Sequence, residues 1–596
     1  MSCTNVVTVR ALALVILMSS TADARSVLCP AARYATSGAA IGPAGTDVTI
    51  DVGSQVSVSP GCERVASRSL RPSRKGTRMR AKWPACSGFD APVALRAIVV
   101  DDCSRLTGTL RSGGEIWTID AERIDCGDGI LEAAAPDVPY EGTVESLATH
   151  ALPRWFADAK FGIMIHWGIF SVPAWAETVL DPEEWLRDLT KLLEPPLYGA
   201  EWFSHIPYVE WYPNTMLIED SPTRLRHLDL YGADFDYEDF RPTFETAAQA
   251  WSAEPWADLF REAGARYVVF VTKHHDGFAL WPSAVSHPMR PGWHATRDYV
   301  GELDQAVRRR CMRMGTYYSG GLDWAVQPGP IRNIFDVPGV QPQSAAYIAY
   351  ADAQWRELVD RYEPAVMWND LGYPTDSDEL ALFADYYNTV PDGVVNDRFV
   401  TLPPYTHHDY VTPEFNVPSE ALPEKFETVR GMDRGFGYNQ NSTDADFTTA
   451  RGLIRQLVDV VSKNGNLLLN VGPMADGTIP APQVERLQAM GAWLGAKGEA
   501  IFATRPWARA EGTTAEGPAV RFTASEDGAI VYAIVLDDVP DRTVTLQDVG
   551  TRVRRVRILG TGTRLKWRFA GDDLVITLRA PLLAGPHAFR LDGLRS

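Results

Sequence analysis

The stretch Tyr267-Val-Val-Phe-Val-Thr-Lys-His-His-Asp-Gly277 is an apolar run that ends abruptly in charged and polar residues. The stretch Phe161-Gly-Ile-Met-Ile-His-Trp-Gly168, earlier in the chain, has the same form. A short apolar run without alternation indicates a strand that is buried on both faces, as in a parallel sheet covered by helices. The two stretches therefore predict parallel strands with polar side chains gathered at their carboxyl ends.

Similar apolar runs recur farther along the chain, with segments of helical periodicity between them. Further strands are expected over residues 314–318, 365–368, 394–396 and 466–470, and helices over 254–263, 345–362 and 446–462. Repeated strand–helix units are typical of the α/β class and favour a catalytic domain of the (β/α)8 TIM barrel type over residues 147–503. A doubly wound open sheet is the alternative that the pattern alone leaves open.

The two ends of the chain have short alternating runs that are typical of antiparallel strands. Residues 26–140 are expected to form an extra, small β domain, and residues 504–596 a C-terminal antiparallel β-sandwich. The small domain contains an odd number of cysteines, so their disulfide pairing is left open. These cysteines are Cys29, Cys62, Cys86, Cys103 and Cys126. Cys311, in a helix-like run, is expected to be a buried thiol.

Residues 1–25 have the pattern of a cleaved secretory signal peptide. Arg10 precedes an apolar run over residues 11–18, and the small residues Ala22 and Ala24 follow it. This run is about half of the roughly 20 residues that cross a bilayer, so no membrane anchor is expected. The bulky Leu28 before Cys29 argues against lipidation of that cysteine. The protein is therefore predicted to be secreted or periplasmic.

The chain of 596 residues is acidic, with a formal net charge of -19. Nucleic acids and anionic membranes attract basic patches, so this charge opposes binding to either of them. A neutral sugar is a compatible substrate. The 18 tryptophans of the chain suit the stacking of sugar rings on aromatic side chains, although many of them belong in the core.

Each predicted strand ends in groups that can bind or react, and a parallel barrel builds its active site at these carboxyl ends. The groups are His166, the run 273–277, Tyr317, the run 368–370 and the run 396–398. Aromatic rings can stack on a sugar while histidines and carboxylates bind its hydroxyls. The pattern thus favours a carbohydrate site.

A metal site is the competing interpretation of the same residues, because histidines and aspartates are zinc and iron ligands. No His-x-His or His-Glu-x-x-His spacing is present, and adjacent His274 and His275 would point to opposite faces if both lay in a strand. No Gly-x-Ser-x-Gly motif supports a serine nucleophile either. We therefore expect carboxylates to carry the chemistry, without a metal or another cofactor.

Several runs of the sequence resemble the α-L-fucosidases of glycoside hydrolase family 29. They are residues 155–173, 263–283, 315–324, 366–370, 395–398, 435–439 and 462–473. The run 263–283 is the most specific of them, and 315–324 is similar to the bacterial branch of the family. The resemblance extends over about residues 147–596 and leaves the N-terminal β domain unexplained.

The resemblance implies a retaining mechanism in which Asp370, in the run Val366-Met-Trp-Asn-Asp370, is the nucleophile. It implies further that other residues bind the fucosyl group, with Glu210 and Trp211 as a hydroxyl-binding pair and the aromatic Trp368 and Phe436 serving its apolar C5 methyl. These residues are His166, Glu210, Trp211, His274, His275, Tyr317, Trp368, Arg398 and Phe436. The implied substrate is a fucosylated glycan.

Two glutamates compete for the role of general acid/base. Glu414, in Thr412-Pro-Glu-Phe415, lies in a proline-containing segment that is expected to be a loop beyond a strand end, and its context resembles that of the family's acid/base. Glu427, in Lys425-Phe-Glu-Thr428, resembles another recurrent glutamate and is expected to support the loop. We favour Glu414 and leave the exchange of the two roles open.

Three other functions are weighed against the fucosidase: a non-catalytic carbohydrate-binding relative, a metal-dependent hydrolase and an α-L-galactosidase. The galactosidase is close because the two sugars differ only in a hydroxyl at C6. The sequence leaves open the linkage and aglycone preference, the role of the N-terminal domain and whether the chain forms a homo-oligomer.

Overall fold

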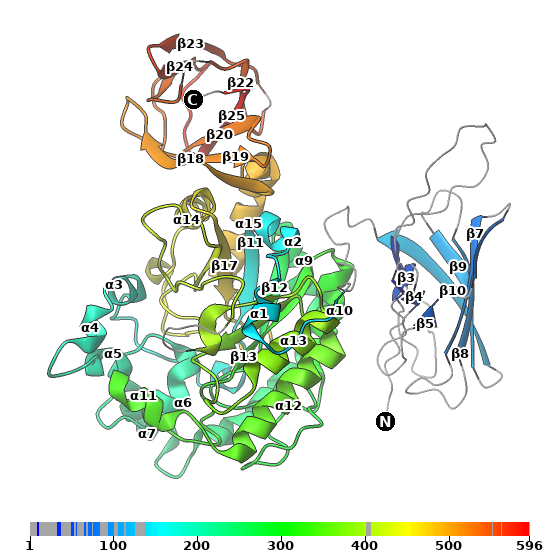
Figure 1. Ribbon diagram of the computed structural model, residues 1–596. Coiled ribbons are helices and arrows are strands. Elements are labelled where there is room, and N and C mark those ends of the chain that lie inside the picture. The colour runs from blue at the N-terminus through cyan, green and yellow to red at the C-terminus, as the bar shows by residue number, and fades with distance from the viewer. Residues whose placement is uncertain are drawn as a thin grey trace. The chain divides into compact units, whose positions relative to one another are not determined.

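A computed structural model describes residues 138–400, 407–550, 552–561 and 563–594, together with the backbone of strands β1 to β10 within the first 137 residues (Figure 1). The chain divides into two compact units. One comprises residues 1–134 and 309–311, and the other comprises residues 135–308 and 312–596. The predicted signal peptide lies largely outside the described residues.

The first unit contains a seven-stranded antiparallel sheet in the order β3-β2-β10-β9-β8-β7-β6. Its strands are β2 (Ala32–Thr36), β3 (Thr49–Val52), β6 (Ser69–Ser73), β7 (Gly76–Trp83), β8 (Val93–Val99), β9 (Arg105–Ser112) and β10 (Glu115–Ile124). A three-stranded sheet consists of β1 (Val9–Arg10), β4 (Gln55–Val56) and β5 (Val65–Ala66). The five cysteines of this part, whose pairing the sequence leaves open, lie outside the described residues.

Cys311 differs from its prediction, because it is disulfide-bonded and only half-buried. Helix α10 (Tyr299–Arg309) ends before it, and Cys311 stands in a left-handed turn with φ of 60°. The helical spacing that suggested a buried thiol therefore does not extend to this residue.

The second unit contains a curled parallel sheet of seven strands in the order β15-β14-β13-β12-β11-β17-β16. The strands are β11 (Phe161–Ile165), β12 (Tyr267–Lys273), β13 (Arg313–Ser319), β14 (Val366–Asp370), β15 (Val394–Val395), β16 (Phe426–Arg430) and β17 (Gly465–Val471). Every residue of β12 is buried, as its uninterrupted apolar sequence predicted.

The segment 410–414 lies between the two edge strands of this sheet. Parallel bridges pair Asn396, just after β15, with Tyr410, and pair Val411 with Phe426 of β16. A third parallel bridge pairs Glu414 with Val429. The open doubly wound alternative leaves two free edges, whereas this curled arrangement is consistent with a (β/α)8 catalytic domain.

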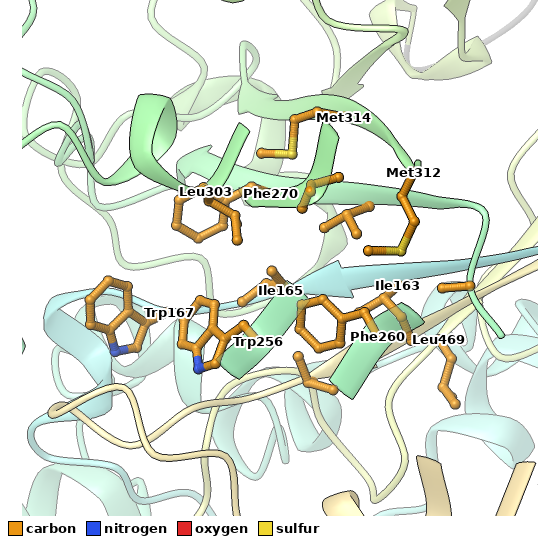
Figure 2. Packing of buried hydrophobic residues seen from close by; sticks show 14 of the residues in the cluster. Ile163, Ile165, Trp167, Trp256, Phe260, Phe270, Leu303, Met312, Met314 and Leu469 are labelled. Atoms are coloured by element: carbon orange, nitrogen blue, oxygen red, sulfur yellow. The ribbon is translucent and has the colours of Figure 1, made fainter. Parts of the chain in front are cut away.

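Helices cover the sheet because each presents an apolar face to it (Figure 1). In α9 (Ala253–Glu262) the buried Trp256 and Phe260 recur at helical spacing. Figure 2 shows both rings packed with Ile163, Ile165 and Phe270 of the strands in one apolar layer. The other long helices are α10, α12 (Ala345–Tyr362), α13 (Glu379–Thr389), α14 (Ala450–Ser462) and α15 (Ala481–Lys497).

Two of the predicted helices begin where a side chain caps their first turn. Helix α12 occupies the predicted residues 345–362, and Ser344 caps it by accepting a hydrogen bond from the backbone N–H of Tyr347. Helix α14 begins at Ala450 rather than at residue 446 as predicted. The Thr449 side chain caps it at that point by accepting from the N–H of Gly452.

The C-terminal part consists of two antiparallel sheets, β18-β19-β20-β25-β22 and β21-β24-β23. The strands are β18 (Thr504–Thr513), β19 (Ala519–Ser525), β20 (Ile530–Val535), β21 (Thr543–Leu546), β22 (Arg555–Ile558), β23 (Lys566–Ala570), β24 (Asp573–Thr577) and β25 (His587–Asp592). Side chains from both sheets, such as Phe522 and Ile576, share one apolar cluster. Among the described residues, no helix has the length and apolarity that crossing a bilayer requires.

Candidate active site

The side chains predicted from the strand ends come together at one edge of the parallel sheet. His166 follows β11, and its ring lies 5.3 Å from that of His274 and 5.6 Å from that of Tyr317, centroid to centroid. His274 and His275 follow the end of β12 instead of lying within it, and their rings are 3.9 Å apart. The opposite orientation expected for two adjacent strand residues therefore does not arise.

Asp370, the last residue of β14, is held by three hydrogen-bond donors. Its Oδ2 accepts from the Tyr317 hydroxyl at 2.7 Å, and its Oδ1 accepts from Arg398 Nη1 and from the N–H of Leu371, each at 3.0 Å. Burial by itself would raise the pKa of Asp370, but the Arg398 charge and these hydrogen bonds outweigh it and lower the pKa below its ordinary value. The residue is therefore an ionised carboxylate at neutral pH.

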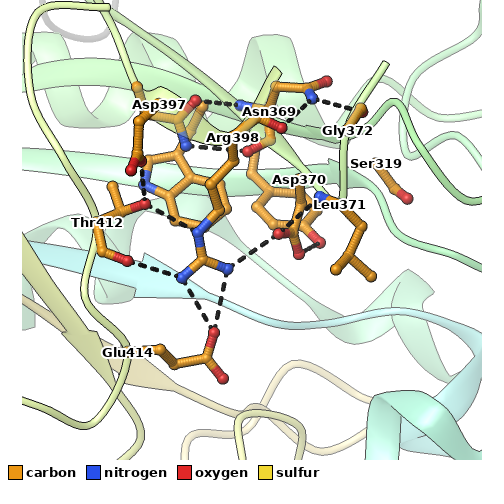
Figure 3. Close-up of polar contacts among 12 residues, drawn as sticks. Ser319, Asn369, Asp370, Leu371, Gly372, Asp397, Arg398, Thr412 and Glu414 are labelled. Carbon is orange, nitrogen blue, oxygen red and sulfur yellow. Dashed lines mark hydrogen bonds and ion pairs between the residues drawn. The ribbon is translucent and has the colours of Figure 1, made fainter. Parts of the chain in front are cut away.

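Arg398 lies between two carboxylates (Figure 3). Its Nη1 is 3.0 Å from Asp370 Oδ1, and both Nη1 and Nη2 are 3.1 Å from Glu414 Oε2. The guanidinium also donates to Thr412 and lies over the Trp368 ring, 4.8 Å from its centroid. These contacts fix the orientation of the planar group.

Glu414 is the more accessible of the two carboxylates, since its side chain is 22% exposed and that of Asp370 is 11% exposed. Its second oxygen, Oε1, accepts a hydrogen bond from the Tyr208 hydroxyl at 2.8 Å. Sequence reasoning missed Tyr208, although it stands two positions before Glu210, which was predicted to be a site residue. No local signal marks it, because its contact with Glu414 spans 206 positions.

Glu427 lies inside the sheet, on β16, and has no exposed surface. It accepts hydrogen bonds from the Tyr267 hydroxyl and from Trp368 Nε1. Burial raises its pKa to about 7, against the lowering effect of these two donors. Its role as support of a loop stays a prediction: its backbone N–H donates to the Val411 carbonyl in segment 410–414 at 2.8 Å, while its side chain holds Trp368 from within a strand.

Glu210 and Trp211 belong to a short 3-10 turn, η3 (Val209–Trp211). Glu210 is buried, and its Oε2 accepts from the N–H of Gly437 at 2.8 Å. Burial is the main cause that raises its pKa to about 8. The Trp211 ring meets that of His275 edge to face at 5.5 Å, and the Phe436 ring lies 5.0 Å from that of His166.

The hydrogen bonds of two histidines fix which ring nitrogen can accept a proton. Ser319 donates its hydroxyl to a carbonyl, so its oxygen accepts from His275 Nδ1 at 2.7 Å. Asn470 donates its amide to the Phe436 carbonyl, so its Oδ1 accepts from His166 Nδ1 at 2.6 Å. In both rings Nε2 remains as the acceptor. Burial lowers the pKa of His275 to about 3 and that of His166 to about 4, so both rings are neutral.

Within the part of the chain that the structure describes, one group of side chains has atoms close enough to share a metal ion: His150, His407 and Asp409. These atoms are engaged in hydrogen bonds. Asp409 is bonded to His150 Nδ1 at 2.8 Å and to the Tyr387 hydroxyl at 2.8 Å, and that hydroxyl meets His407 Nε2 at 2.7 Å. The strand-end histidines are not members of this group.

The family model described as Alpha-L-fucosidase matches residues 130–499. The tissue alpha-L-fucosidase of Bos taurus is 35% identical over 463 residues, which are 74% of this chain and 88% of that protein. The tissue enzyme of Homo sapiens is 35% identical over 477 residues, 77% of this chain and 92% of that protein. Two solved structures of Thermotoga maritima alpha-fucosidase are similar to this chain, one in complex with a mechanism-based inhibitor and one in complex with fucose. Each is 40% identical in sequence and superimposes with a TM-score of 0.66. Each match covers 76% of this chain and 100% of the solved chain. The chain therefore belongs to the α-L-fucosidase family of glycoside hydrolases.

Proposed function

We propose that the chain is a retaining, exo-acting α-L-fucosidase that hydrolyses terminal α-L-fucosides of glycans, with Asp370 as nucleophile and Glu414 as acid/base. One observation carries the assignment: Arg398 Nη1 lies 3.0 Å from an oxygen of Asp370 and 3.1 Å from an oxygen of Glu414. Two atoms that share such a neighbour are at most about 6 Å apart, which favours the spacing of about 5–5.5 Å in retaining enzymes over about 6.5–9.5 Å in inverting ones.

Each carboxylate has one task in each of two displacements. In the first, Asp370 attacks the anomeric carbon, the glycosidic C–O bond breaks, and Glu414 gives its proton to the leaving oxygen. In the second, Glu414 takes a proton from water, the water oxygen attacks the anomeric carbon, and Asp370 leaves as a carboxylate. The low pKa of Asp370 keeps the nucleophile ionised.

The surrounding residues are proposed to bind the fucosyl group. Neutral His166 and His275 present Nε2 acceptors to sugar hydroxyls. His274, Tyr317, Arg398, Glu210 and Trp211 complete the polar part, and Trp368 and Phe436 face the C5 methyl. An apolar ring at that position favours fucose over L-galactose, whose C6 hydroxyl it would leave unsatisfied.

The architecture and setting are proposed with the same function. The closing segment 410–414 supports a (β/α)8 barrel, flanked by a small N-terminal β domain and a C-terminal β-sandwich. The run 315–324 supports placement in the bacterial branch, and the predicted signal peptide supports a secreted or periplasmic enzyme. The acidic charge supports a glycan substrate rather than nucleic acid.

The test is hydrolysis of an aryl α-L-fucoside and an aryl α-L-galactoside, followed by a panel of fucosylated oligosaccharides. We expect turnover of the fucoside, with α-L-fucose as the first product detected by NMR. β-L-fucose as first product would exclude retention, faster hydrolysis of the galactoside would reassign the substrate, and binding of fucose without turnover would indicate the carbohydrate-binding alternative.

A further inference from the structure

Tyr208 is the one side chain besides Arg398 that donates a hydrogen bond to the carboxylate of Glu414 in the described structure. The two donors divide the carboxylate between them: Arg398 holds Oε2 with two N–H groups, and the Tyr208 hydroxyl holds Oε1 at 2.8 Å. We propose that Tyr208 is a positioning residue for the acid/base, which aims Oε1 of Glu414 at the glycosidic oxygen. The inference rests on the role proposed above for Glu414.

The Tyr208 ring is fixed on several sides. It is buried, it meets the rings of Trp202 and Phe436 edge to face at 5.5 Å and 5.2 Å, and it stacks with Phe415 at 6.2 Å. The backbone beside it is fixed too, since a Cβ on Gly435 would come within 2.7 Å of the Pro207 carbonyl oxygen. Because the ring is held in one place, the oxygen of the Tyr208 hydroxyl has a fixed position beside Glu414.

The hydroxyl also keeps its proton. Burial and the neighbouring Glu414 charge raise the pKa of Tyr208 well above its ordinary value. It therefore remains a protonated hydrogen-bond donor to the carboxylate at neutral pH. Donation to the ionised form stabilises that form, so the hydroxyl favours the state in which Glu414 acts as a base.

Oε1 is also the oxygen that can exchange a proton with the substrate. Oε2 already accepts two N–H groups from Arg398, so a proton arriving on Glu414 is expected on Oε1. When Oε1 is protonated, the O–H bond of Tyr208 can rotate away and break its hydrogen bond to Oε1 while the ring stays in place. A tyrosine thus suits both protonation states, whereas a second fixed cation would oppose the acid.

The test is Tyr208→Phe, which removes the hydroxyl and keeps the ring. We expect kcat/KM for a natural fucosyl disaccharide to fall about 10-fold, a part of the 10²–10⁴-fold that a general acid supplies. For an activated aryl fucoside, whose leaving group needs no proton, we expect a fall of less than about 3-fold. The alkaline limb of the disaccharide profile should move to higher pH, because the ionised carboxylate has lost a donor.

Tyr212→Phe is the matched control. Tyr212 lies four positions after Tyr208 and is also buried, but its hydroxyl bonds to His227 Nδ1 at 2.9 Å and not to Glu414. We expect this variant to leave the ratio of the two substrates and the pH profile unchanged. An equal fall on both substrates in Tyr208→Phe, or an unmoved alkaline limb, would show that the residue is only structural.

The Glu414→Ala background separates this inference from the proposed function. Because Glu414→Ala has no carboxylate to position, adding Tyr208→Phe to it should not lower kcat/KM for the disaccharide any further. A further several-fold fall in kcat/KM in the double variant would overturn the inference. If Glu414→Ala alone leaves kcat/KM for the disaccharide unchanged, the proposed role of Glu414 as acid/base is wrong. If Glu414→Ala behaves as an acid/base variant and Tyr208→Phe behaves as wild type, only the role of Tyr208 fails.

Discussion

Lys273 and Asp323 form an ion pair in which Nζ and Oδ2 are 2.9 Å apart and neither side chain has any exposed surface. Lys273 ends β12, directly before His274, and the N–H of Trp324, directly after Asp323, donates to the His275 carbonyl at 2.7 Å. The pair is therefore connected to the two histidines of the site by the chain on one side and by this hydrogen bond on the other. Removing one partner of such a pair strands a buried charge.

We predict that Lys273→Met lowers the free energy of unfolding of the unit that contains the parallel sheet by about 3–5 kcal/mol. The double variant Lys273→Met, Asp323→Leu should lose less than the single one, because no charge is left unpaired. Chemical denaturation measures both. Arg154→Met is the control: its side chain is 74% exposed in an ion pair with Asp158, so a change of less than about 1 kcal/mol is expected. Equal losses in Lys273→Met and Arg154→Met would contradict the prediction.

The nucleophile is tested by Asp370→Gly. We expect turnover of an aryl α-L-fucoside to fall by several orders of magnitude while the affinity for fucose changes little, because the histidines and aromatic rings remain. Added azide should partly restore the rate by attacking the vacated face, so NMR should identify the product as the inverted β-fucosyl azide. A near-normal rate without azide would end the assignment.

The choice between the two glutamates is tested by comparing Glu414→Ala with Glu427→Ala. Glu414→Ala should cripple cleavage of disaccharides far more than formation of the glycosyl-enzyme from an aryl fucoside, and azide should then give the α-fucosyl azide, the retained anomer. Glu427→Ala should instead lower the melting temperature, because it leaves the Tyr267 hydroxyl and Trp368 Nε1 without their buried acceptor. The opposite pattern would exchange the two roles.

Glu210 predicts a pH dependence of stability. Its folded pKa is raised to about 8, whereas an unfolded glutamate titrates near about 4.3. Between these two values the folded state binds the proton of Glu210 more tightly than the unfolded state does. The contribution of Glu210 to the free energy of unfolding is therefore fully present below about pH 4.3 and is lost as pH rises toward about 8. Glu210→Gln keeps an acceptor for Gly437 and cannot ionise.

Melting temperatures between pH 5 and pH 8.5 should therefore fall less steeply in Glu210→Gln than in the wild type. Glu427, with a pKa of about 7, has the same sign and remains in both proteins, so a smaller slope is expected rather than a flat profile. Parallel curves for the two proteins would show that Glu210 is ionised in the folded state.

The parallel sheet and the polar ends of its strands could be predicted from the sequence. Uninterrupted apolar runs such as 267–272 can be satisfied only by burial on both faces, and the residues that follow them must then lie at the carboxyl edge. This is why His166, His274 and Tyr317 could be grouped before any contact between them was known. Helix α12 was equally accessible, because its periodicity and its Ser344 cap are local.

The different surroundings of the two candidate glutamates follow from how the folded chain packs. The local sequence favoured Glu414 but left the exchange of roles open. The register of β16 turns Glu427 toward Tyr267 inside the sheet, while segment 410–414 carries Glu414 to Arg398 and Tyr208. Tyr208 and Glu414 are 206 positions apart, and their contact depends on how the curled sheet brings its edges together. The local sequence pattern around either residue cannot predict such a contact, because the contact depends on the packing of the whole sheet.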